Sequence, residues 1–186
     1  MQSCKSAAKT VCLAPLGQVS ADLVKRLVDR YRAEYGLEIR VLTPQEIPST
    51  IVTSVGEQYD ANVLLDHLAS VFPDSFTDSD DVVIGLTPVD LYDSTSHFRY
   101  VFGIKGTVQD PKGIVSTSRM GPEVYGQRPD DAVTFERTWK LVSKYIGLSY
   151  YVLEPSDDPD SAVYDNILGP DDLDKMNDRL DVPGLD

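Results

Sequence analysis

The sequence predicts an α/β (α+β) fold, in which a mostly parallel sheet of four to five strands packs against about three main helices. Three observations support this prediction. Apolar, strand-like runs alternate with amphipathic helical patterns in the first half, a long helix followed by turns fills the second half, and 41% of the residues are hydrophobic. A chain of 186 residues with this composition can bury one sizeable core, so we expect a single domain over residues 1–186.

The first two elements have clear start and stop signals. Thr10–Pro15 is an apolar run typical of a buried strand. Ser20 is a favoured N-cap residue, and Gly36 is a typical helix stop, so a helix is expected between them. Apolar residues recur along this segment at helical spacing: Leu23, Leu27, Tyr31 and Tyr35. Residues 1–9, before the strand, are expected to be a flexible N-terminus.

The middle of the chain continues the alternation of strands and helices. Leu37–Leu42 alternates apolar and polar residues as a half-buried strand does, and Pro44 and Pro48 then interrupt regular structure. Tyr59–Phe72 has the apolar spacing of a second helix. Asp81–Leu86, "DVVIGL", is the strongest buried strand in the sequence.

The second half is expected to contain two further strands and a long helix. Strand-like runs follow "VDLY" (Val89–Tyr92): Tyr100–Gly106, "YVFGIKG", and Gly113–Met120, "GIVSTSRM". The third helix begins at Asp130 or Asp131 and runs to Gly147. Residues 152–186 form an acidic, turn-rich C-terminal segment, with one short helix expected over Pro170–Asn177.

The charge distribution argues against nucleic acid as a partner. The formal net charge is −13, and residues 154–186 carry eleven acidic residues against two basic ones. Phosphate contacts need clustered Lys and Arg, which the sequence lacks. No apolar run approaches the roughly 20 residues of a membrane-spanning helix, so no membrane span is expected.

Cysteine usage leaves the compartment open, and a cytoplasmic location is the favoured expectation. Cys4 and Cys12 are the two cysteines of the chain, too few for a disulfide framework. The apolar run Val11–Leu16 follows Lys5 and Lys9 but is too brief for a signal-peptide core. A processed lipoprotein, which Cys4 so near the start would mark, and a secreted form remain alternatives.

Five segments, in this order along the chain, resemble one known family. They are "CLAPLGQVS" near the start, "YDANVLLDHL" in the second helix, "GLTPVDLYDSTSHFRYVFG" in the middle, "GIVSTSRM", and "FERTWKLV" in the third helix. Together they resemble the archaemetzincins, a branch of the metzincin zinc proteases, over roughly Val11–Met176. The resemblance implies a twisted mixed sheet, an active-site helix bearing HExxHxxGxxH, and a methionine turn beneath a zinc ion.

The zinc motif of that family is absent from this chain. Aligning its glycine on Gly147 places Lys140 and Lys144 at the two helical histidines, Leu141 at the glutamate and Tyr150 at the third ligand. Zinc needs lone pairs from imidazole, thiolate or carboxylate, whereas a protonated lysine offers only donors. A leucine cannot take a proton from water. We therefore expect no metal, no cofactor and no catalytic residue at these positions.

The remaining features of the family pattern are also altered. Its usual spacing places the turn methionine on Asp158, and a small shift in the loop would make Val163 the equivalent. The family's second, cysteine-rich zinc site has no cysteines here. His67 and His97 have no ligand-spaced partner, so a surface or core role is expected for both.

The two lysines have three interpretations from sequence. In the first, they occupy the remnant metal cleft and bind an anion. In the second, Glu136, Lys140 and Lys144 form a ladder of i, i+4 pairs on a solvated helix face. In the third, an aspartate of the C-terminal segment folds back onto the lysines as an internal ion pair. The candidates for that role are Asp157, Asp158, Asp160 and Asp165.

Two further residues are candidates for ligand binding in the remnant cleft. Tyr150 pairs apolar area with a polar tip, as residues that line ligand pockets do. Thr117 lies in the "IVSTS" strand, and the resemblance implies that an edge strand above the cleft pairs with extended peptide. The ordinary alternatives are core packing for Tyr150 and a β-branched strand position for Thr117.

The sequence therefore predicts a catalytically inactive archaemetzincin-like protein, a pseudo-metalloprotease that binds a peptide or protein. Its candidate binding residues are Lys140, Lys144, Tyr150 and Thr117. One alternative is an enzyme of altered, metal-independent hydrolase or peptidase chemistry. The other is a structural or interaction protein that acts through its acidic C-terminal segment.

Overall fold

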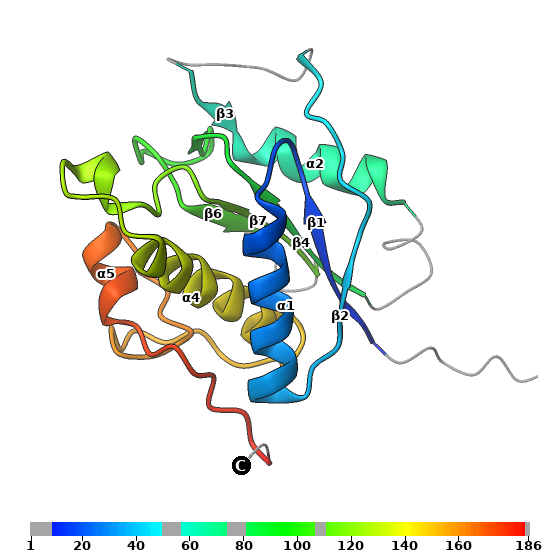
Figure 1. The fold of residues 1–186 in the computed structure, drawn as a ribbon, viewed down its shortest axis with the longest axis vertical. Helices are drawn as coiled ribbons and strands as arrows, with labels where there is room; N and C mark the ends of the chain where they lie inside the picture. The colour runs from blue at the N-terminus through cyan, green and yellow to red at the C-terminus, as the bar shows by residue number, and fades with distance from the viewer. Residues whose placement is uncertain (1–8, 50–56, 74–80, 107–110, 185–186) are drawn as a thin grey trace, which may run out of the picture.

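The chain forms a five-stranded sheet with helices on both faces (Figure 1). The computed structural model describes residues 9–49, 57–73, 81–106 and 111–184. The strand order in the sheet is β2-β1-β4-β7-β6. The strand bounds are β1 Val11–Pro15, β2 Ile39–Val41, β4 Val82–Thr87, β6 Gly103–Lys105 and β7 Lys112–Ser116. The predicted α/β class with four to five strands is confirmed.

Four of the five strands are parallel, and the fifth turns back at one edge. β1 pairs in parallel with β2 and β4, and β4 pairs in parallel with β7. β6 runs antiparallel to β7, with Ile104 opposite Ile114. The sheet is therefore mixed, as the resemblance implied, and β6 is an edge strand of the described sheet.

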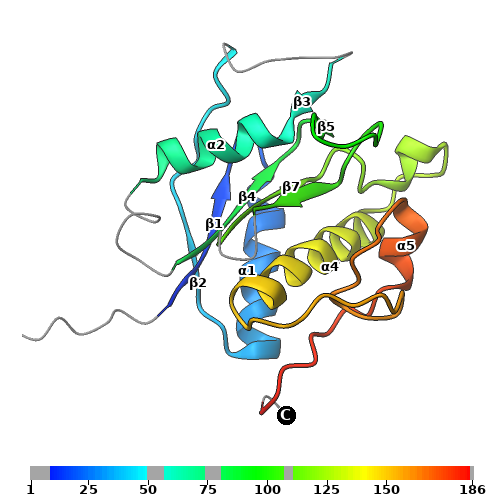
Figure 2. The same ribbon diagram turned by 180° about the vertical axis from the view of Figure 1, so that it is seen from behind.

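Helices α1 and α4 cover one face of the sheet, and α2 covers the other (Figures 1 and 2). Successive side chains of a strand point to opposite faces. Accordingly, Val11 and Leu13 of β1 contact the cluster that holds α1 and α4, whereas Cys12 and Ala14 contact the cluster that holds α2. A strand buried on both faces must be apolar throughout, which is why "VCLAP" shows no alternation.

The first helix begins and ends where the sequence predicts. α1 spans Ala21–Tyr35. The Ser20 hydroxyl accepts a hydrogen bond from the Leu23 N–H (3.3 Å), and Gly36 adopts the left-handed conformation at φ 58°. These two caps set the length of the helix and aim the chain into β2.

The second helix and a small parallel ribbon lie on the other face. α2 spans Ala61–Val71, and the Asp60 carboxylate caps it by accepting from the Asn62 N–H (2.9 Å). Directly before the helix, β3 (Tyr59–Asp60) pairs in parallel with β5 (Leu91–Tyr92). The prediction of a helix over Tyr59–Phe72 is confirmed, apart from the two residues that pair with β5.

The longest helix of the described residues is α4, Asp131–Ser149. Its N-cap is Asp130, whose carboxylate accepts from the N–H groups of Ala132 (2.9 Å) and Val133 (3.2 Å). A short 3-10 helix, η2 (Pro122–Tyr125), precedes it. The helix continues past Gly147, the residue at which the sequence predicted its end.

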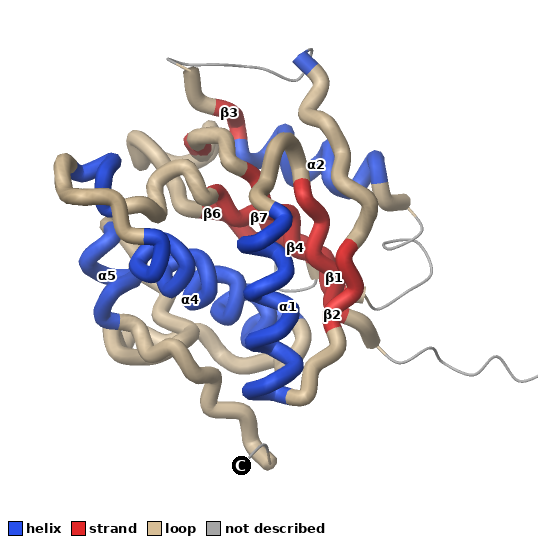
Figure 3. The backbone as a smooth tube through the Cα atoms, viewed as in Figure 1, coloured by secondary structure: helices blue, strands red, loops and turns tan. Residues whose placement is uncertain are grey.

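The C-terminal segment is mostly loop, apart from the short helix α5, Pro170–Lys175 (Figure 3). Its apolar side chains nevertheless belong to the core, because Leu173, Met176 and Leu180 are buried against α1 and α4. The Trp139 indole donates to the Asp178 carbonyl (2.7 Å). The segment is therefore part of the folded domain. No helix in the described ranges has the length and hydropathy needed to cross a membrane.

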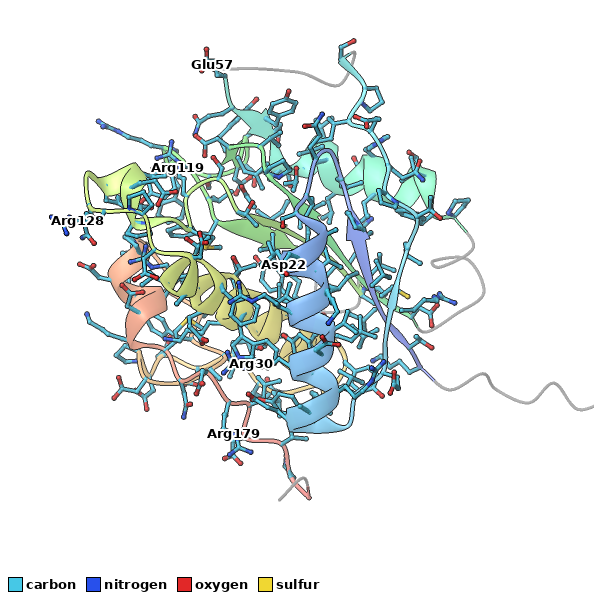
Figure 4. All side chains as sticks on the ribbon, in the orientation of Figure 1. Asp22, Arg30, Glu57, Arg119, Arg128 and Arg179 are labelled. Atoms are coloured by element: carbon cyan, nitrogen blue, oxygen red, sulfur yellow. The ribbon has the colours of Figure 1, made fainter. Side chains whose placement is uncertain are left out.

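One arginine joins three parts of this face. Arg30 of α1 donates to Glu136 of α4 (2.8 Å) and to Asp178 of the C-terminal segment (2.7 Å), between α1 and α4 (Figure 4). Its guanidinium also lies 4.2 Å from the centroid of the Trp139 ring. Because Glu136 forms its ion pair with Arg30, the ladder of Glu136 with the two α4 lysines, one of the three interpretations from sequence, is wrong.

Candidate functional site: a pocket between β6, α4 and the C-terminal segment

A cavity of about 210 Å³ lies beside the edge strand β6. We call it the β6 pocket. Its lining comes from β6 and the preceding loop (Phe98, Tyr100, Val101, Phe102, Gly103, Ile104), from α4 (Leu141, Lys144, Tyr145), from the C-terminal segment (Asp165, Ile167, Leu168), and from Asp93. Under the alignment of the motif glycine on Gly147, Leu141 and Lys144 take the positions of the family's catalytic glutamate and second histidine. That the β6 pocket is the predicted remnant cleft stays a prediction.

A glycine allows β6 to lie close to α4. A Cβ added to Gly103 would lie 2.2 Å from the Ile114 carbonyl oxygen and 3.1 Å from the Tyr145 hydroxyl. Any larger residue would force β6 away from its neighbours. The edge strand and the helix thus form two adjoining walls of the pocket.

Lys144 pairs with an aspartate of the C-terminal segment inside this pocket. Its residue is 6% exposed, and its ammonium donates to the Asp165 carboxylate at 3.1 Å. Burial lowers the pKa of Lys144 by disfavouring the ammonium, and the Asp165 charge partly opposes this effect. The predicted internal ion pair is therefore confirmed for Asp165.

The second carboxylate at the pocket, Asp93, is held by a hydrogen-bond network. It accepts from the Asn62 side-chain amide (2.8 Å) and from the Thr95 N–H (2.9 Å) and hydroxyl (2.7 Å). Burial acts to raise the pKa of Asp93, but these hydrogen bonds outweigh it and the pKa is lowered. Asp93 consequently contributes a fixed negative charge near the pocket.

Lys140 points to a different place. Its ammonium donates to the carbonyl oxygens of Leu173 (3.0 Å) and Asp174 (2.8 Å), at the end of α5. Unpaired carbonyls at a helix C-terminus attract such a cation. Lys140 does not line the β6 pocket, so the structure separates the two lysines that the sequence analysis placed together.

Tyr150 also lies outside the β6 pocket. Because α4 continues to Ser149, Tyr150 forms the end of the helix, and its N–H donates to Ile146 O (2.7 Å). Its ring packs edge-on against Tyr151, with a centroid separation of 4.9 Å, and lies 5.9 Å from the Lys9 ammonium. The proposed place of Tyr150 in the cleft is therefore wrong.

Gly147 serves close packing in this chain. It has no positive φ, and a Cβ added to it would lie 2.8 Å from Leu180 Cδ2 and 3.1 Å from Val163 Cγ1. Of the two candidates for the methionine-turn position, Val163 is buried beneath α4 at this glycine, whereas Asp158 is exposed. The equivalence of Val163 with the methionine stays a prediction.

Thr117 does not lie on the edge strand, contrary to the expectation from sequence. It directly follows β7, an inner strand that pairs with both β4 and β6. Its N–H donates to Thr87 O at 2.8 Å. It lines a separate cavity of about 350 Å³ between the starts of α1 and α4. The four buried residues of β7, Gly113–Ser116, mark an inner strand, whereas β6 is only half-buried and forms the edge.

Two apolar residues that sequence reasoning did not select lie at this pocket. Phe98 is 57% exposed and Leu168 is 65% exposed, and both line the β6 pocket. Sequence could have indicated them, because each is a large apolar side chain in a loop with polar residues: Phe98 in "STSHFRY" and Leu168 in "YDNILGP". Apolar groups left in water beside a cavity are typical of binding sites.

The residues at the family's metal positions do not fit a zinc ion. Lys140 donates to backbone carbonyls, Lys144 is an ammonium donor to Asp165, and Tyr150 is elsewhere. None of these groups presents a lone pair toward a shared point. Within the described ranges, no group of three or more His, Cys, Asp or Glu residues is arranged to hold a metal ion.

Comparison with known proteins identifies relatives of this chain in archaea. The chain is 26% identical to an archaemetzincin of Methanocaldococcus jannaschii over 137 residues, which cover 74% of this chain and 70% of the relative. It is 25% identical to an archaemetzincin of Pyrococcus furiosus over 141 residues, covering 74% and 71%. No family model matches the chain.

Solved structures share the fold. A zinc-dependent peptidase from Methanocorpusculum labreanum superposes with a TM-score of 0.75 at 23% identity, covering 91% of this chain and 95% of the other. An archaemetzincin from Archaeoglobus fulgidus, complexed with malonate, gives a TM-score of 0.69 at 18% identity, covering 92% and 94%. These structures show the fold that the chain shares with them. In sequence, the chain is similar to archaemetzincins over 74% of its length, and it lacks the HExxHxxGxxH motif.

Proposed function

We propose that this chain is a pseudo-metalloprotease, an archaemetzincin-like protein without a zinc site, which binds an extended, apolar peptide segment of a partner protein in the β6 pocket. One observation carries the proposal. The edge strand β6 borders a cavity in which a paired lysine occupies a metal-ligand position, while two exposed apolar side chains, Phe98 and Leu168, flank it.

The chemistry of the pocket argues against peptide hydrolysis by the family's mechanism. Leu141 is 2% exposed and has no group that can take a proton from water. The Lys144 ammonium, paired with Asp165, has no lone pair to donate to a metal ion. The two residues most directly needed for metal-assisted hydrolysis therefore have other roles here.

The remaining features suit peptide recognition. An edge strand has backbone groups that a second strand can pair with, and the side-chain pockets beside it give specificity. Phe98 and Leu168 offer apolar contact, and the two carboxylates of Asp93 and Asp165 disfavour acidic ligands. We therefore expect a segment with an apolar anchor residue next to Lys or Arg, which also suits the net charge of −13.

The test uses a displayed library of random dodecapeptides selected on the immobilised protein. Enriched sequences are expected to share an apolar residue beside a basic one. Their affinity, measured by fluorescence anisotropy, should fall at least about tenfold in the double variant Phe98→Ala/Leu168→Ala, because such anchors dominate binding energy.

A matched control is available in the same chain. Val41 and Val124 are also large, exposed apolar residues (45% each) but do not line the β6 pocket. The variant Val41→Ala/Val124→Ala should bind the selected peptides as well as the wild type. An equal loss in both double variants, or no enrichment at all, would contradict peptide binding in this pocket. Hydrolysis of the same peptides in a chelator-sensitive manner would contradict the loss of peptidase activity.

A further inference from the structure

Lys144 is a primary amine held inside a cavity of otherwise mostly apolar surface. Its side chain is 8% exposed, in contrast to that of Lys25, which is 74% exposed. Neighbouring walls of the β6 pocket come from Leu141, Phe102 and Ile104. Lys144 is thus shielded from bulk water, yet it lines the cavity that an entering molecule would occupy.

The immediate neighbours of this amine set its protonation. The other titratable groups that line the same pocket are Asp165 on the C-terminal segment, Asp93 on the loop after β5, Tyr100 before β6, and Tyr145 on α4. Asp165 contacts the amine directly, at 3.1 Å. Burial lowers the pKa of Lys144 and so favours the neutral, nucleophilic amine, while the Asp165 charge favours the ammonium and partly opposes this effect.

We propose that Lys144 is a carbonyl-reactive lysine, which forms a reversible imine with uncharged, apolar aldehydes that enter the β6 pocket. The apolar lining favours such molecules, and the carboxylates of Asp93 and Asp165 disfavour anionic ones such as 2-oxo acids. The chemistry requires the pocket, this amine and the Asp165 carboxylate, so it goes beyond peptide binding and does not depend on it.

The step is a condensation that releases one water molecule. The lone pair of the neutral Lys144 amine attacks the carbonyl carbon, a C–N bond forms, and the carbonyl π electrons move to oxygen. The Asp165 carboxylate, which lies within hydrogen-bonding distance, takes the proton from nitrogen and returns it to that oxygen. Asp165 then takes the remaining proton from nitrogen and gives it to the carbinolamine hydroxyl, which leaves as water while the nitrogen lone pair forms the C=N bond; no net oxidation occurs.

Benzaldehyde with sodium cyanoborohydride tests the proposal, because hydride reduces the imine to a stable secondary amine. Intact mass and peptide mapping at pH 7 then report which lysines are modified. We expect Lys144 to be modified at least tenfold faster than Lys140 and Lys25. Glyoxylate, a small anionic aldehyde, should modify Lys144 at least tenfold more slowly than benzaldehyde.

Two variants make the result interpretable. Lys144→Arg keeps a cation beside Asp165 but cannot form the imine, and Lys144→Met removes the charge while keeping an unbranched side chain. Both should lose the fast modification, while slow modification of Lys140 and Lys25 continues at the wild-type rate and circular dichroism reports an unchanged fold. Equal rates at Lys144 and Lys25 in the wild type would overturn the proposal. Equal modification by glyoxylate and benzaldehyde would overturn the ligand class.

Discussion

A buried lysine either has its charge compensated by a partner or loses its proton more readily. For Lys144, Asp165 compensates part of the charge, and burial still lowers the pKa. Asp165 compensates the charge from one side, at 3.1 Å, but the side chain of that aspartate is itself 59% exposed and well solvated. Desolvation consequently still lowers the pKa of the lysine. An ion pair of this kind positions a charged group more than it stabilises the fold.

The burial of the Lys144 ammonium beside a solvated Asp165 carboxylate predicts how Lys144→Met changes stability. The substitution removes a buried ammonium and leaves a solvated Asp165, so at pH 7 we expect the variant to be more stable by about 1 kcal/mol. The folded-state pKa of Lys144 lies below the usual value of about 10.4, so the unfolded chain binds this proton more tightly. The unfolding free energy of the wild type therefore rises with pH up to about 10.4. The difference in stability between Lys144→Met and the wild type shrinks over the same range.

Urea unfolding of the two proteins at several pH values from 7 to 10 measures this difference. The comparison cancels the titration of tyrosines, which both proteins share. A difference in unfolding free energy that does not change with pH would contradict the lowered pKa.

Gly147→Ala tests the packing beneath α4. The added Cβ would lie 2.8 Å from Leu180 Cδ2, so the neighbours must shift at a cost of about 1–3 kcal/mol. Ser149→Ala, two residues further along the helix, adds no atoms and should change stability by less than about 0.5 kcal/mol. Urea denaturation of both variants at pH 7 measures the two costs, and similar values for both would show that the site has room.

At the scale of elements, α4 holds α5 through two side chains of different chemistry. Arg137, 5% exposed, donates twice to the Asp174 carboxylate at 2.7 Å, and also to Met120 O at 3.0 Å. Lys140 donates to the carbonyl at the end of α5. A helix of six residues cannot persist alone, so these contacts determine that it forms.

Asp174→Asn should therefore destabilise the domain by about 1–3 kcal/mol at pH 7, because it leaves the Arg137 charge without its partner. Hydrogen bonds from Arg137 lower the pKa of Asp174. Such a group stabilises the fold above its unfolded value of about 3.9, and the contribution is lost as pH falls through the lower, folded value. The difference between variant and wild type should thus shrink as pH is lowered from 5 to 2.

Asp181→Asn is the control for this prediction, since Asp181 is an exposed aspartate of the same segment. Its effect should stay within about 0.5 kcal/mol at every pH. If Asp174→Asn also stays within that limit at pH 7, the Arg137 pair contributes nothing to stability.

At the scale of the whole molecule, the acidic C-terminal segment completes the core. Leu173, Met176 and Leu180 are buried, and burying each such side chain stabilises a fold by about 1.5–3 kcal/mol. Together these contributions are comparable to the total stability of a typical domain, about 5–15 kcal/mol. Deletion of residues 152–186 should therefore abolish cooperative thermal unfolding, as measured by circular dichroism and dye binding. A truncated chain that still unfolds cooperatively near the wild-type temperature would contradict this role.

Metal content is a second property of the whole molecule. Protein purified from zinc-supplemented medium without chelator should contain far less than one zinc per chain by elemental analysis. Because a metal bound to the native state stabilises it, a chelator should leave the melting temperature unchanged. Stoichiometric zinc, or a marked drop in melting temperature with chelator, would contradict the proposed loss of the zinc site.

The local elements of this fold could be predicted from sequence because their signals are local. Ser20 and Gly36 bound α1, Asp130 caps α4, and the apolar run at β4 is buried, all as expected. The lack of zinc ligands at the family's motif positions is likewise a property of the sequence, because it depends only on which side chains can donate lone pairs.

Only the tertiary structure decided what these side chains contact. Helical spacing places Lys140 and Lys144 on one face, but their partners come from segments 21 to 34 residues further along the chain. Four aspartates could have paired with the lysines, and loop packing selected Asp165. Thr117 follows an inner strand because β6 turns back beside β7. Sequence periodicity determines which face a residue occupies, whereas long-range packing determines what that face meets, since contacts between distant segments leave no local pattern.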